Sequence, residues 1–246
     1  MQKVETFPKS VAQIYDQIMG YFDYEKSART IDDIIKNHWY GTAKPDVLEI
    51  GIGTGNIASA LIELGYNVEG IDHSSAMLAR AKEKFPEILL HHADIKDFSL
   101  DKLFGVVLSH AGPLRMDYAP ERGYFFETYL ESKQDVEKAL QNVSRHLMQD
   151  GIFLMSVQTA PGRERTMSST PIYEQLEGGY VATKVITDEG NIRIKRRELR
   201  KDGRLVASIT HRFLVLDLNE FSETALRYNL QDRGLDSTEH FCIYLR

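Results

Sequence analysis

The 246-residue chain lacks several features that would place it in a particular class of protein. It has one cysteine, Cys242, so no disulfide can form within the chain, and a buried small side chain is its expected role. No apolar run approaches membrane-spanning length, and residues 1–8 lack the apolar core of a signal peptide. We therefore expect a cytoplasmic protein that does not enter a membrane.

An excess of positive charge is also missing. The chain has 36 acidic and 30 basic residues, which gives a net charge of −6. This balance argues mildly against a polyanionic partner, although a local basic patch could still exist. With 42% hydrophobic residues, the length suits one large globular domain or a domain with a cap.

The most informative stretch is 47–56, Val-Leu-Glu-Ile-Gly-Ile-Gly-Thr-Gly-Asn. Four strand-forming residues lead into a glycine-rich turn, and an apolar stripe with helical spacing follows between Ile57 and Leu64. Glycine lets a ligand approach the backbone closely because it has no Cβ, and the helix start offers free N–H groups. The pattern indicates a site for a nucleotide or for the carboxylate of an amino acid.

The third glycine of the dinucleotide-binding fingerprint Gly-x-Gly-x-x-Gly is missing, because it would fall at position 56, which is Asn56. Glycine recurs instead at every second position, as Gly51, Gly53 and Gly55. Preceded by Glu49, this stretch resembles the first motif of the class I S-adenosylmethionine-dependent methyltransferases. An NAD(P)-dependent oxidoreductase on a similar fold is the alternative, and Asn56 speaks against it.

Strand and helix patterns alternate after this turn. Further strands are expected at 67–71, 88–91, 104–109 and 152–155, with apolar-striped helices between them. The alternation predicts an α/β fold with a Rossmann-like, doubly wound and mostly parallel sheet. Ligands bind such sheets at the carboxyl ends of the strands, near the point where the strand order reverses.

The remaining segments differ from this core. Three strand patterns between 181 and 216, joined by strong turn sequences, predict an antiparallel β-sheet whose apolar face is covered by the core domain or by a second subunit. The family resemblance implies an inserted sheet here that covers the substrate or forms a homodimer contact. Only one strand, 241–245, is expected after a final helix at 222–232, where the family usually has two. The expected division is an N-terminal helical cap at 1–45, the cofactor-binding core at 46–158, the inserted sheet at 159–218 and a returning helix and strand at 219–246.

The family resemblance implies roles for residues at the strand ends. Asp72, about 20 residues after the first glycine, accepts from the ribose hydroxyls. Asp94 accepts from the adenine amino group, and Glu49 supports the turn and the ammonium of the ligand. Plain structural roles stay open, such as helix capping for Asp72 and core packing for Met77. The residues expected to contact S-adenosylmethionine are Tyr15, Tyr24, Glu49, Gly51, Gly53, Gly55, Asn56, Asp72, His73, Met77, Asp94, Ile95 and His110.

The stretch 109–113, Ser-His-Ala-Gly-Pro, follows the fourth strand, where the methyl group meets its acceptor in this family. DNA methyltransferases carry Asn/Asp-Pro-Pro-Tyr/Phe there, so DNA is not an expected substrate. His110 is the leading candidate for a general base because the unperturbed histidine pKa lies near neutrality, and it could equally contact the cofactor. Tyr118 and Tyr124 are the next catalytic candidates. They lie in a long aromatic connection, at 112–134, that we expect to be a binding loop.

Within the family, the chain is most similar to the glycine N-methyltransferase-like and amino-sugar N-methyltransferase group, through Tyr15-Asp16 and the inserted sheet. This similarity implies methyl transfer to a nitrogen or oxygen of a small molecule. No metal is expected, because His91 and His92 have no companion ligand at metal-binding spacing. A non-catalytic cofactor-binding module and an RNA methyltransferase remain alternatives.

Overall fold

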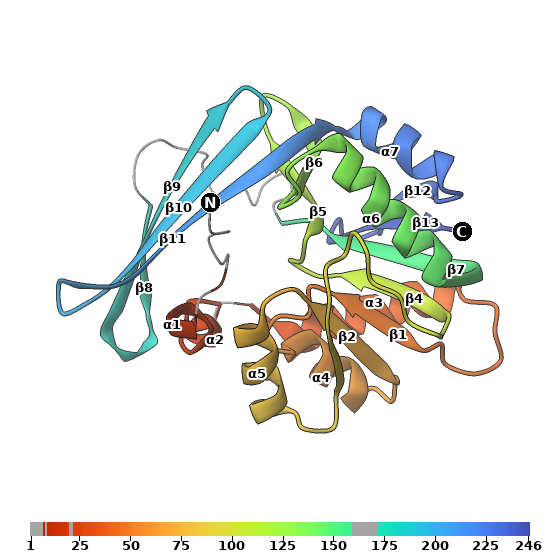
Figure 1. The fold of residues 1–246 in the computed structure, drawn as a ribbon, viewed down its shortest axis with the longest axis horizontal. Coiled ribbons are helices and arrows are strands. Elements are labelled where there is room, and N and C mark those ends of the chain that lie inside the picture. The colour runs from red at the N-terminus through yellow and green to blue at the C-terminus, as the bar shows by residue number, and fades with distance from the viewer. Residues whose placement is uncertain (1–6, 8, 20–21, 159–171) are drawn as a thin grey trace.

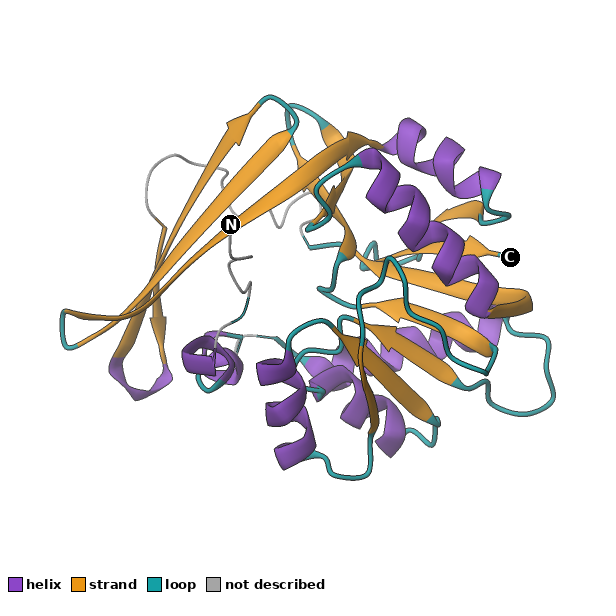
Figure 2. Cartoon of the chain, in the orientation of Figure 1, coloured by secondary structure: helices purple, strands orange, loops and turns teal. Residues whose placement is uncertain are grey.

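The computed structural model describes residues 7, 9–19, 22–158 and 172–246. The start of the expected cap and the start of the expected insertion, 159–171, lie outside the described residues. Two β-sheets and the helices that cover one of them make up the fold (Figures 1 and 2).

The first sheet has seven strands in the order β12-β13-β7-β4-β1-β2-β3. Strands β1 to β4 and β7 are mutually parallel, and β13 runs antiparallel to both β7 and β12. The strand order reverses between β1 and β4, as in a doubly wound sheet, which confirms the predicted fold class. The strands are β1 Val47–Ile50, β2 Val68–Asp72, β3 Leu89–His92, β4 Phe104–Ser109, β7 Leu147–Ser156, β12 Gln231–Leu235 and β13 Phe241–Leu245.

Helices cover both faces of this sheet (Figure 2). On one face, α3 and α4 pack against Val47, Val106 and their neighbours, and on the other α6 and α7 pack against Leu48, Val107 and Phe153. Because both faces are covered, the central strands are apolar without alternation, and β1 and β4 are buried along their whole length. The helices are α3 Tyr24–His38, α4 Asn56–Glu63, α5 Ser75–Lys84, α6 Lys133–His146 and α7 Leu218–Arg227.

The second sheet is antiparallel and has six strands in the order β5-β6-β11-β10-β9-β8. Its long strands β9, β10 and β11 confirm the three strands predicted in the last third of the chain, with Gly190 and Gly203 at positive φ in the hairpin turns. The strands are β5 Leu114–Ala119, β6 Gly123–Thr128, β8 Ile172–Leu176, β9 Tyr180–Glu189, β10 Ile192–Lys201 and β11 Arg204–Asp217.

The predicted binding loop at 112–134 is wrong. This segment contains the hairpin β5–β6, and β6 pairs with β11, so strands from within the expected core segment belong to the second sheet. Leu114, Met116 and Phe126 point into the main hydrophobic core. The charged residues Arg115 and Asp117, which follow Leu114 and Met116 in the sequence, are buried as well. In the sequence alone, such charges indicate a solvent-exposed segment, so they did not reveal a buried strand.

The end of the chain also differs from the prediction. Helix α7 begins at Leu218 and ends at Arg227, so residues 231–235, expected to be partly helical, are free to form β12. This strand pairs antiparallel with β13 and supplies the second C-terminal strand that the sequence pattern missed. Its sequence, Gln-Asp-Arg-Gly-Leu, is largely exposed and polar, so it carries no apolar alternation.

The two short helices of the N-terminal cap lie between the two sheets (Figure 1). The expected helical cap contains the two short helices α1 Lys9–Ala12 and α2 Tyr15–Ile18 and the longer α3, which has Asp23 as its N-cap. Ile14 packs against Ala182 and Leu199 of the second sheet. None of the helices within the described residues is long and apolar enough to cross a membrane.

Candidate functional site

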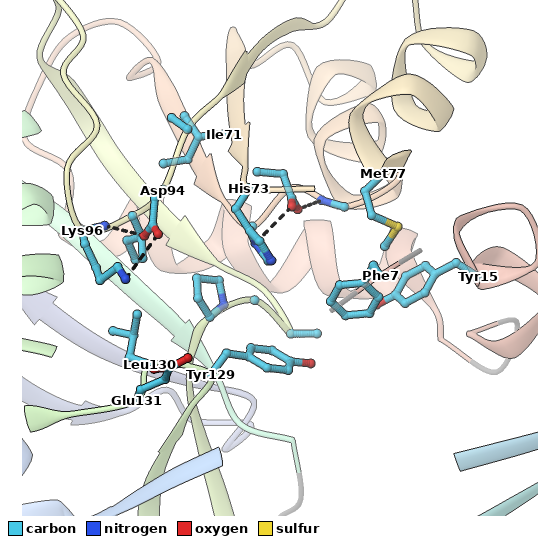
Figure 3. A pocket seen from close by; sticks show the side chains of 18 residues that line it. Phe7, Tyr15, Ile71, His73, Met77, Asp94, Lys96, Tyr129, Leu130 and Glu131 are labelled. Carbon is cyan, nitrogen blue, oxygen red and sulfur yellow. Dashed lines mark hydrogen bonds and ion pairs between the residues drawn. The ribbon is translucent and has the colours of Figure 1, made fainter. Parts of the chain in front are cut away.

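Two neighbouring cavities lie at the carboxyl ends of the parallel strands, and Figure 3 shows the larger one. The larger measures about 360 Å³ and the smaller about 40 Å³, and they share Tyr15, Gly51, Gly53 and Ala111. Predicted residues in the larger cavity alone are Asp72, His73, Met77, Asp94 and Ile95. Those in the smaller cavity alone are Tyr24, Glu49, Asn56 and His110. Among the predicted cofactor residues, only Gly55 lines neither of these two cavities.

The glycine turn is shaped by backbone conformations that other residues rarely adopt. Gly51, Gly53 and Gly55 have φ of 73°, 57° and 83°, which explains their spacing at every second position. A Cβ on Gly51 would also lie 2.4 Å from the Pro113 side chain. Gly55 is the N-cap of α4, so it shapes the turn from behind the cavities.

Asp72 closes β2 and holds the turn in place. Its Oδ2 accepts from the Gly53 N–H at 2.9 Å, and its Oδ1 accepts from the Ser74 N–H at 2.8 Å. Only 7% of the residue is exposed, and burial raises the pKa of its carboxyl. The His73 ring, half exposed, lies beside it with Nδ1 3.6 Å from Oδ1.

Asp94 and its neighbours form the opposite side of the larger cavity from Met77, Tyr15 and Phe7 (Figure 3). The Asp94 carboxylate accepts from the Lys96 N–H at 3.0 Å and lies 3.4 Å from Lys96 Nζ. Ile95 is buried beside it, and the Asn142 side chain donates to its carbonyl at 2.8 Å. These contacts fix the loop after β3 against α6.

Glu49, in the floor of the smaller cavity, is a buried acid that has a backbone hydrogen bond from Ala58 but keeps one carboxyl oxygen without a donor. The residue is 1% exposed, and its Oε2 makes no hydrogen bond within the described part of the chain. Burial, followed by the nearby charge of Asp72, raises the pKa of Glu49 well above its ordinary value. A buried carboxyl oxygen with no donor is costly unless a ligand supplies one.

His110 lies beside Glu49 in the smaller cavity, enclosed by aromatic rings. Its ring centroid is 5.0 Å from that of Phe22, 6.2 Å from that of Tyr24 and 6.0 Å from that of Phe241. Burial lowers the pKa of His110 to about 4, so the imidazole is neutral at neutral pH. Such an imidazole is a weaker base than the one expected from the sequence. The base role therefore stays a prediction, and contact with the cofactor is the better-supported role.

Tyr118 and Tyr124, the other catalytic candidates, line neither cavity. They are opposite one another on β5 and β6, with ring centroids 5.1 Å apart. The β5–β6 hairpin holds both rings outside the two cavities, whereas a flexible loop could have brought them to the site. Their catalytic role has no support from the geometry.

Several residues of the larger cavity were missed by sequence reasoning: Phe7, Lys96, Tyr129, Leu130 and Glu131. The last three directly precede Ser132, the N-cap of α6. A capping box search could have placed this helix start, and thus the three residues, at the strand ends. Phe7 joins Tyr129 across the cavity mouth, with ring centroids 6.1 Å apart.

A polar network ties the cap to the glycine turn. Asp16 on α2 accepts from Thr54 Oγ1 at 2.6 Å, Asn56 Nδ2 at 3.0 Å and Lys84 Nζ at 2.7 Å. Burial alone would raise the pKa of Asp16, but these hydrogen bonds, chiefly from Lys84, outweigh it and lower that pKa. Asn56, which replaces the fingerprint glycine, thus joins α2 to α4.

No group of three or more His, Cys, Asp or Glu side chains among the described residues is arranged to hold a metal ion. The groups that line the two cavities include the carboxylates of Glu49, Asp72 and Asp94, the imidazoles of His73 and His110, and several aromatic rings. This is a donor set for an organic ligand that carries hydroxyl and ammonium groups.

Comparison with known proteins agrees with this site. The family model described as "Methyltransferase domain" matches residues 47–151. The chain is 25% identical over 183 residues to the dTDP-3-amino-3,6-dideoxy-alpha-D-glucopyranose N,N-dimethyltransferase of Streptomyces fradiae, a match that covers 73% of this chain. It covers 61% of that relative, so the chain spans less than two thirds of the relative's length.

Solved structures match the fold over nearly the whole chain. Streptomyces venezuelae DesVI superposes with a TM-score of 0.75 at 19% identity and covers 98% of both chains. CalS10, an amino pentose methyltransferase from Micromonospora echinaspora solved with S-adenosylmethionine bound, has a TM-score of 0.71 at 18% identity and covers 100% of both chains. Residues 47–151 thus match the methyltransferase-domain model, and the predicted resemblance to the class I methyltransferases is confirmed.

Proposed function

We propose that this methyltransferase-domain chain transfers a methyl group from S-adenosylmethionine to a nitrogen of a small molecule of the amino-sugar class. The observation that carries the proposal is the buried Oε2 of Glu49, which has no hydrogen-bond donor beside the glycine turn. Two further facts support it: the methyltransferase domain at 47–151, and relatives whose names specify N-methylation of amino sugars.

The residues of the two cavities fit the cofactor. Glu49 Oε2 lacks a donor, and the ammonium of the methionyl part would supply one in the smaller cavity. The positive φ of Gly51 and Gly53 leaves backbone facing the cavity with no Cβ in the way. Asp72 would accept from the ribose hydroxyls, and Asp94 and Ile95 would hold the adenine. When bound, S-adenosylmethionine supplies a methyl group activated by a positively charged sulfur.

The chain's own residues then act by binding, orienting and excluding water. Alignment of the acceptor nitrogen, the methyl carbon and the sulfur accounts for up to about 7–11 kcal/mol of barrier reduction for ideally held reactants. Phe22, Tyr24 and Tyr15 line the smaller cavity and keep water from its floor. Their ring faces also suit a cationic ligand.

A nitrogen acceptor suits this site better than an oxygen acceptor. A hydroxyl must lose its proton as it attacks, so its methylation needs a base, whereas a neutral amine attacks through its lone pair and sheds a proton afterwards. His110, the leading base candidate, has a pKa of about 4. Such a group is half protonated only well below neutral pH and removes a hydroxyl proton poorly.

An activity assay tests the proposal. Wild-type protein and Asp72→Ala are incubated with S-adenosylmethionine and matched pairs of sugars that differ only by an amino or a hydroxyl group. We expect S-adenosylhomocysteine to form with the amino sugars, faster as the pH rises towards the pKa of the amine. Asp72→Ala should lose cofactor binding. Turnover of only the hydroxyl sugars would contradict the nitrogen assignment.

The same assay separates the alternatives. Binding of S-adenosylmethionine without turnover of any acceptor would support a non-catalytic module. Binding of NAD instead would support an oxidoreductase, an alternative that is disfavoured because Asn56 is held by Asp16 and Lys84 at the start of α4. A cytoplasmic location, a homodimer contact through the second sheet and the exclusion of DNA as substrate stay predictions.

A further inference from the structure

Tyr129 lies at the border between the larger cavity and the second sheet. It belongs to the short connection between β6 and α6, is half-buried, and lines the cavity. Its ring packs against two rings of β11, with centroids 5.2 Å from that of His211 and 4.5 Å from that of Phe213. The second sheet therefore holds this tyrosine in place beside the cavity of the first sheet.

The hydroxyl of Tyr129 points away from the part of the cavity proposed for the adenine. Figure 3 shows the ring extending towards Phe7 and Tyr15, on the opposite side from Asp94. The Phe7 ring lies between the two tyrosines, with centroids 6.1 Å from that of Tyr129 and 5.8 Å from that of Tyr15. Because Tyr15 lines both cavities, this side of the larger cavity adjoins the smaller one, where the methionyl part is proposed to bind.

A buried arginine sets the direction of the Tyr129 hydroxyl proton. Arg115, on β5, is 5% exposed, and its Nη1 donates to the Tyr129 oxygen at 3.4 Å. A guanidinium has donors only, so the phenol oxygen must accept from it. The phenol proton, which the positive charge of Arg115 repels, therefore points away from the arginine.

Arg115 is itself fixed by the second sheet. Its Nε and Nη2 both donate to Glu127 Oε1, at 2.9 Å and 2.6 Å. Its guanidinium also lies over the ring of Phe213, 4.2 Å from the ring centroid. The position of Nη1 is thus set by the fold and needs no ligand. The Tyr129 hydroxyl is oriented in advance, which lowers the entropy cost of any contact that it makes with a ligand.

The donor of this hydroxyl is available to a ligand. Within the described residues, no hydrogen-bond acceptor lies within reach of the Tyr129 proton, and the polar contact of the hydroxyl is with Arg115. Water can take the proton in the free protein, and a ligand oxygen held at the same place can replace that water. An oxygen is the expected partner, because the proton of a phenol requires an acceptor.

From this geometry we propose that Tyr129 binds the methyl acceptor by donating a hydrogen bond to a hydroxyl oxygen of the amino sugar, with Arg115 as the residue that orients it. The inference rests on the proposed function and adds a residue to the acceptor side of the site. The sugar hydroxyl is not the reacting atom, so the hydrogen bond is as strong before methyl transfer as during it. Such a contact contributes to acceptor binding and leaves the chemical step unchanged.

Steady-state kinetics of Tyr129→Phe test the assignment, with the amino sugar that the wild type methylates fastest. We expect the KM for this sugar to rise about three- to tenfold, as for the loss of one neutral hydrogen bond, and kcat to stay within about twofold. The Kd for S-adenosylhomocysteine, measured by calorimetry, should not change. The variant keeps the ring that packs on β11, so it should fold.

Tyr228→Phe is the matched control. This tyrosine at the end of α7 is also half-buried and loses the same hydroxyl, but it packs against the main core and lines neither cavity. Its substitution should leave the KM, kcat and cofactor affinity unchanged.

Sugars that each lack one hydroxyl identify the oxygen that Tyr129 contacts. With the wild type, one of these deoxy sugars should have a higher KM than the parent sugar. With Tyr129→Phe, the KM values of this pair should converge, because the hydrogen bond is already lost. A purely structural role for Tyr129 would instead raise the KM of all the sugars alike and keep the differences between them.

Three results would overturn the assignment: equal KM values in Tyr129→Phe and the wild type, KM values that rise alike for every sugar, or weaker S-adenosylhomocysteine binding with an unchanged acceptor KM. The last result would assign the hydroxyl to the cofactor. Each of them, obtained while the amino sugar is still methylated, would leave the proposed function standing. Failure of the wild type to methylate any amine would refute the proposed function and the acceptor role of Tyr129 with it.

Discussion

Two buried glutamates, one in each sheet, have opposite electrostatics. Glu49 on β1 is 1% exposed, and Glu127 on β6 is 0% exposed. Burial raises the pKa of Glu49 well above its ordinary value. Burial also acts to raise the pKa of Glu127, but Lys195 and Arg115 outweigh it and lower that pKa to about 2. The same side chain is thus an unpaired acid in one sheet and a paired anion in the other.

The difference separates a structural charge from a functional one. Glu127 Oε1 accepts from Arg115 Nε at 2.9 Å, Arg115 Nη2 at 2.6 Å and Lys195 Nζ at 2.6 Å, and so ties β5, β6 and β10 together. The Oε2 of each glutamate makes no hydrogen bond within the described residues. That of Glu127 lies 3.8 Å from Arg193 Nη1, whereas no cation among the described residues lies within ion-pair distance of Glu49. The fold itself balances the charge of the first carboxylate, whereas the second is the one that we propose a ligand pairs.

Replacement of Glu127 should give the largest effect. Glu127→Gln leaves Arg115 and Lys195 buried beside a neutral amide, and removal of one member of a buried ion pair costs about 3–5 kcal/mol. We expect a fall of this size in the free energy of unfolding, measured by urea titration. Glu198→Gln is the control, because its pairs with Arg196 and Arg200 lie on the solvent side and should cost at most about 1 kcal/mol. Equal losses in the two variants would remove the distinction.

The second prediction concerns the pH dependence of stability through His110. Its pKa is 6.5 ordinarily and about 4 in the folded protein, so the unfolded chain binds more protons between these values. The stability that it contributes is present above pH 6.5 and is lost as the pH falls towards 4, by up to about 3 kcal/mol. Urea titrations at several pH values should show this slope in the wild type.

His110→Asn is expected to flatten that slope, and His92→Asn, at an exposed position, is expected to keep it. An unchanged slope in His110→Asn would show that another group titrates. The same variant informs on catalysis: if His110 only contacts the cofactor, the pH dependence of turnover should follow the amine acceptor and survive the substitution.

The cofactor half was the more predictable half from the sequence. Gly51, Gly53, Asp72 and Asp94 stand at the ends of neighbouring parallel strands, so their approach follows from the alternation of strands and helices. The role expected for each of these residues followed from the short stretch of sequence around it. The pattern could be read because local sequence and fold agree there.

The second sheet could not be predicted in the same way. Arg115, Glu127 and Lys195 belong to three strands, and only the pairing of β6 with β11 and of β11 with β10 brings them together. A buried charge in a strand looks like a solvent-facing residue until its partner is known. The hairpin β5–β6 was therefore mistaken for a loop, and Tyr118 and Tyr124 for residues of the site.

The third prediction tests the connection between the cap and the turn. Asp16→Asn should lower stability by about 1 kcal/mol through weakened charge-assisted hydrogen bonds from Thr54 and Lys84. Because Tyr15 on the same helix lines both cavities, we also expect a several-fold weaker Kd for S-adenosylhomocysteine. Asp33→Asn, at an exposed position on α3, serves as control. An Asp16→Asn protein with lower stability but unchanged cofactor affinity would limit the network to a structural role.

The smallest effect is expected at Tyr118. Because its ring lies outside both cavities, Tyr118→Phe should change turnover by less than about twofold and stability by less than about 0.5 kcal/mol. Tyr129→Phe, inside the larger cavity, is the comparison and should have the greater effect on acceptor or cofactor affinity. A large loss of turnover in Tyr118→Phe would restore its catalytic assignment and contradict the geometry of the hairpin.

The most direct test of the account is a calorimetric titration of wild type and Glu49→Gln with two ligands. S-adenosylhomocysteine carries the ammonium that Glu49 is proposed to bind, and 5′-methylthioadenosine lacks it. We predict that Glu49→Gln binds the first ligand at least about tenfold more weakly, through loss of a buried charge-assisted contact, and binds the second like the wild type. Equal affinities of both proteins for both ligands would contradict the assignment of Glu49. They would also contradict the distinction between a ligand-binding Glu49 and a structural Glu127.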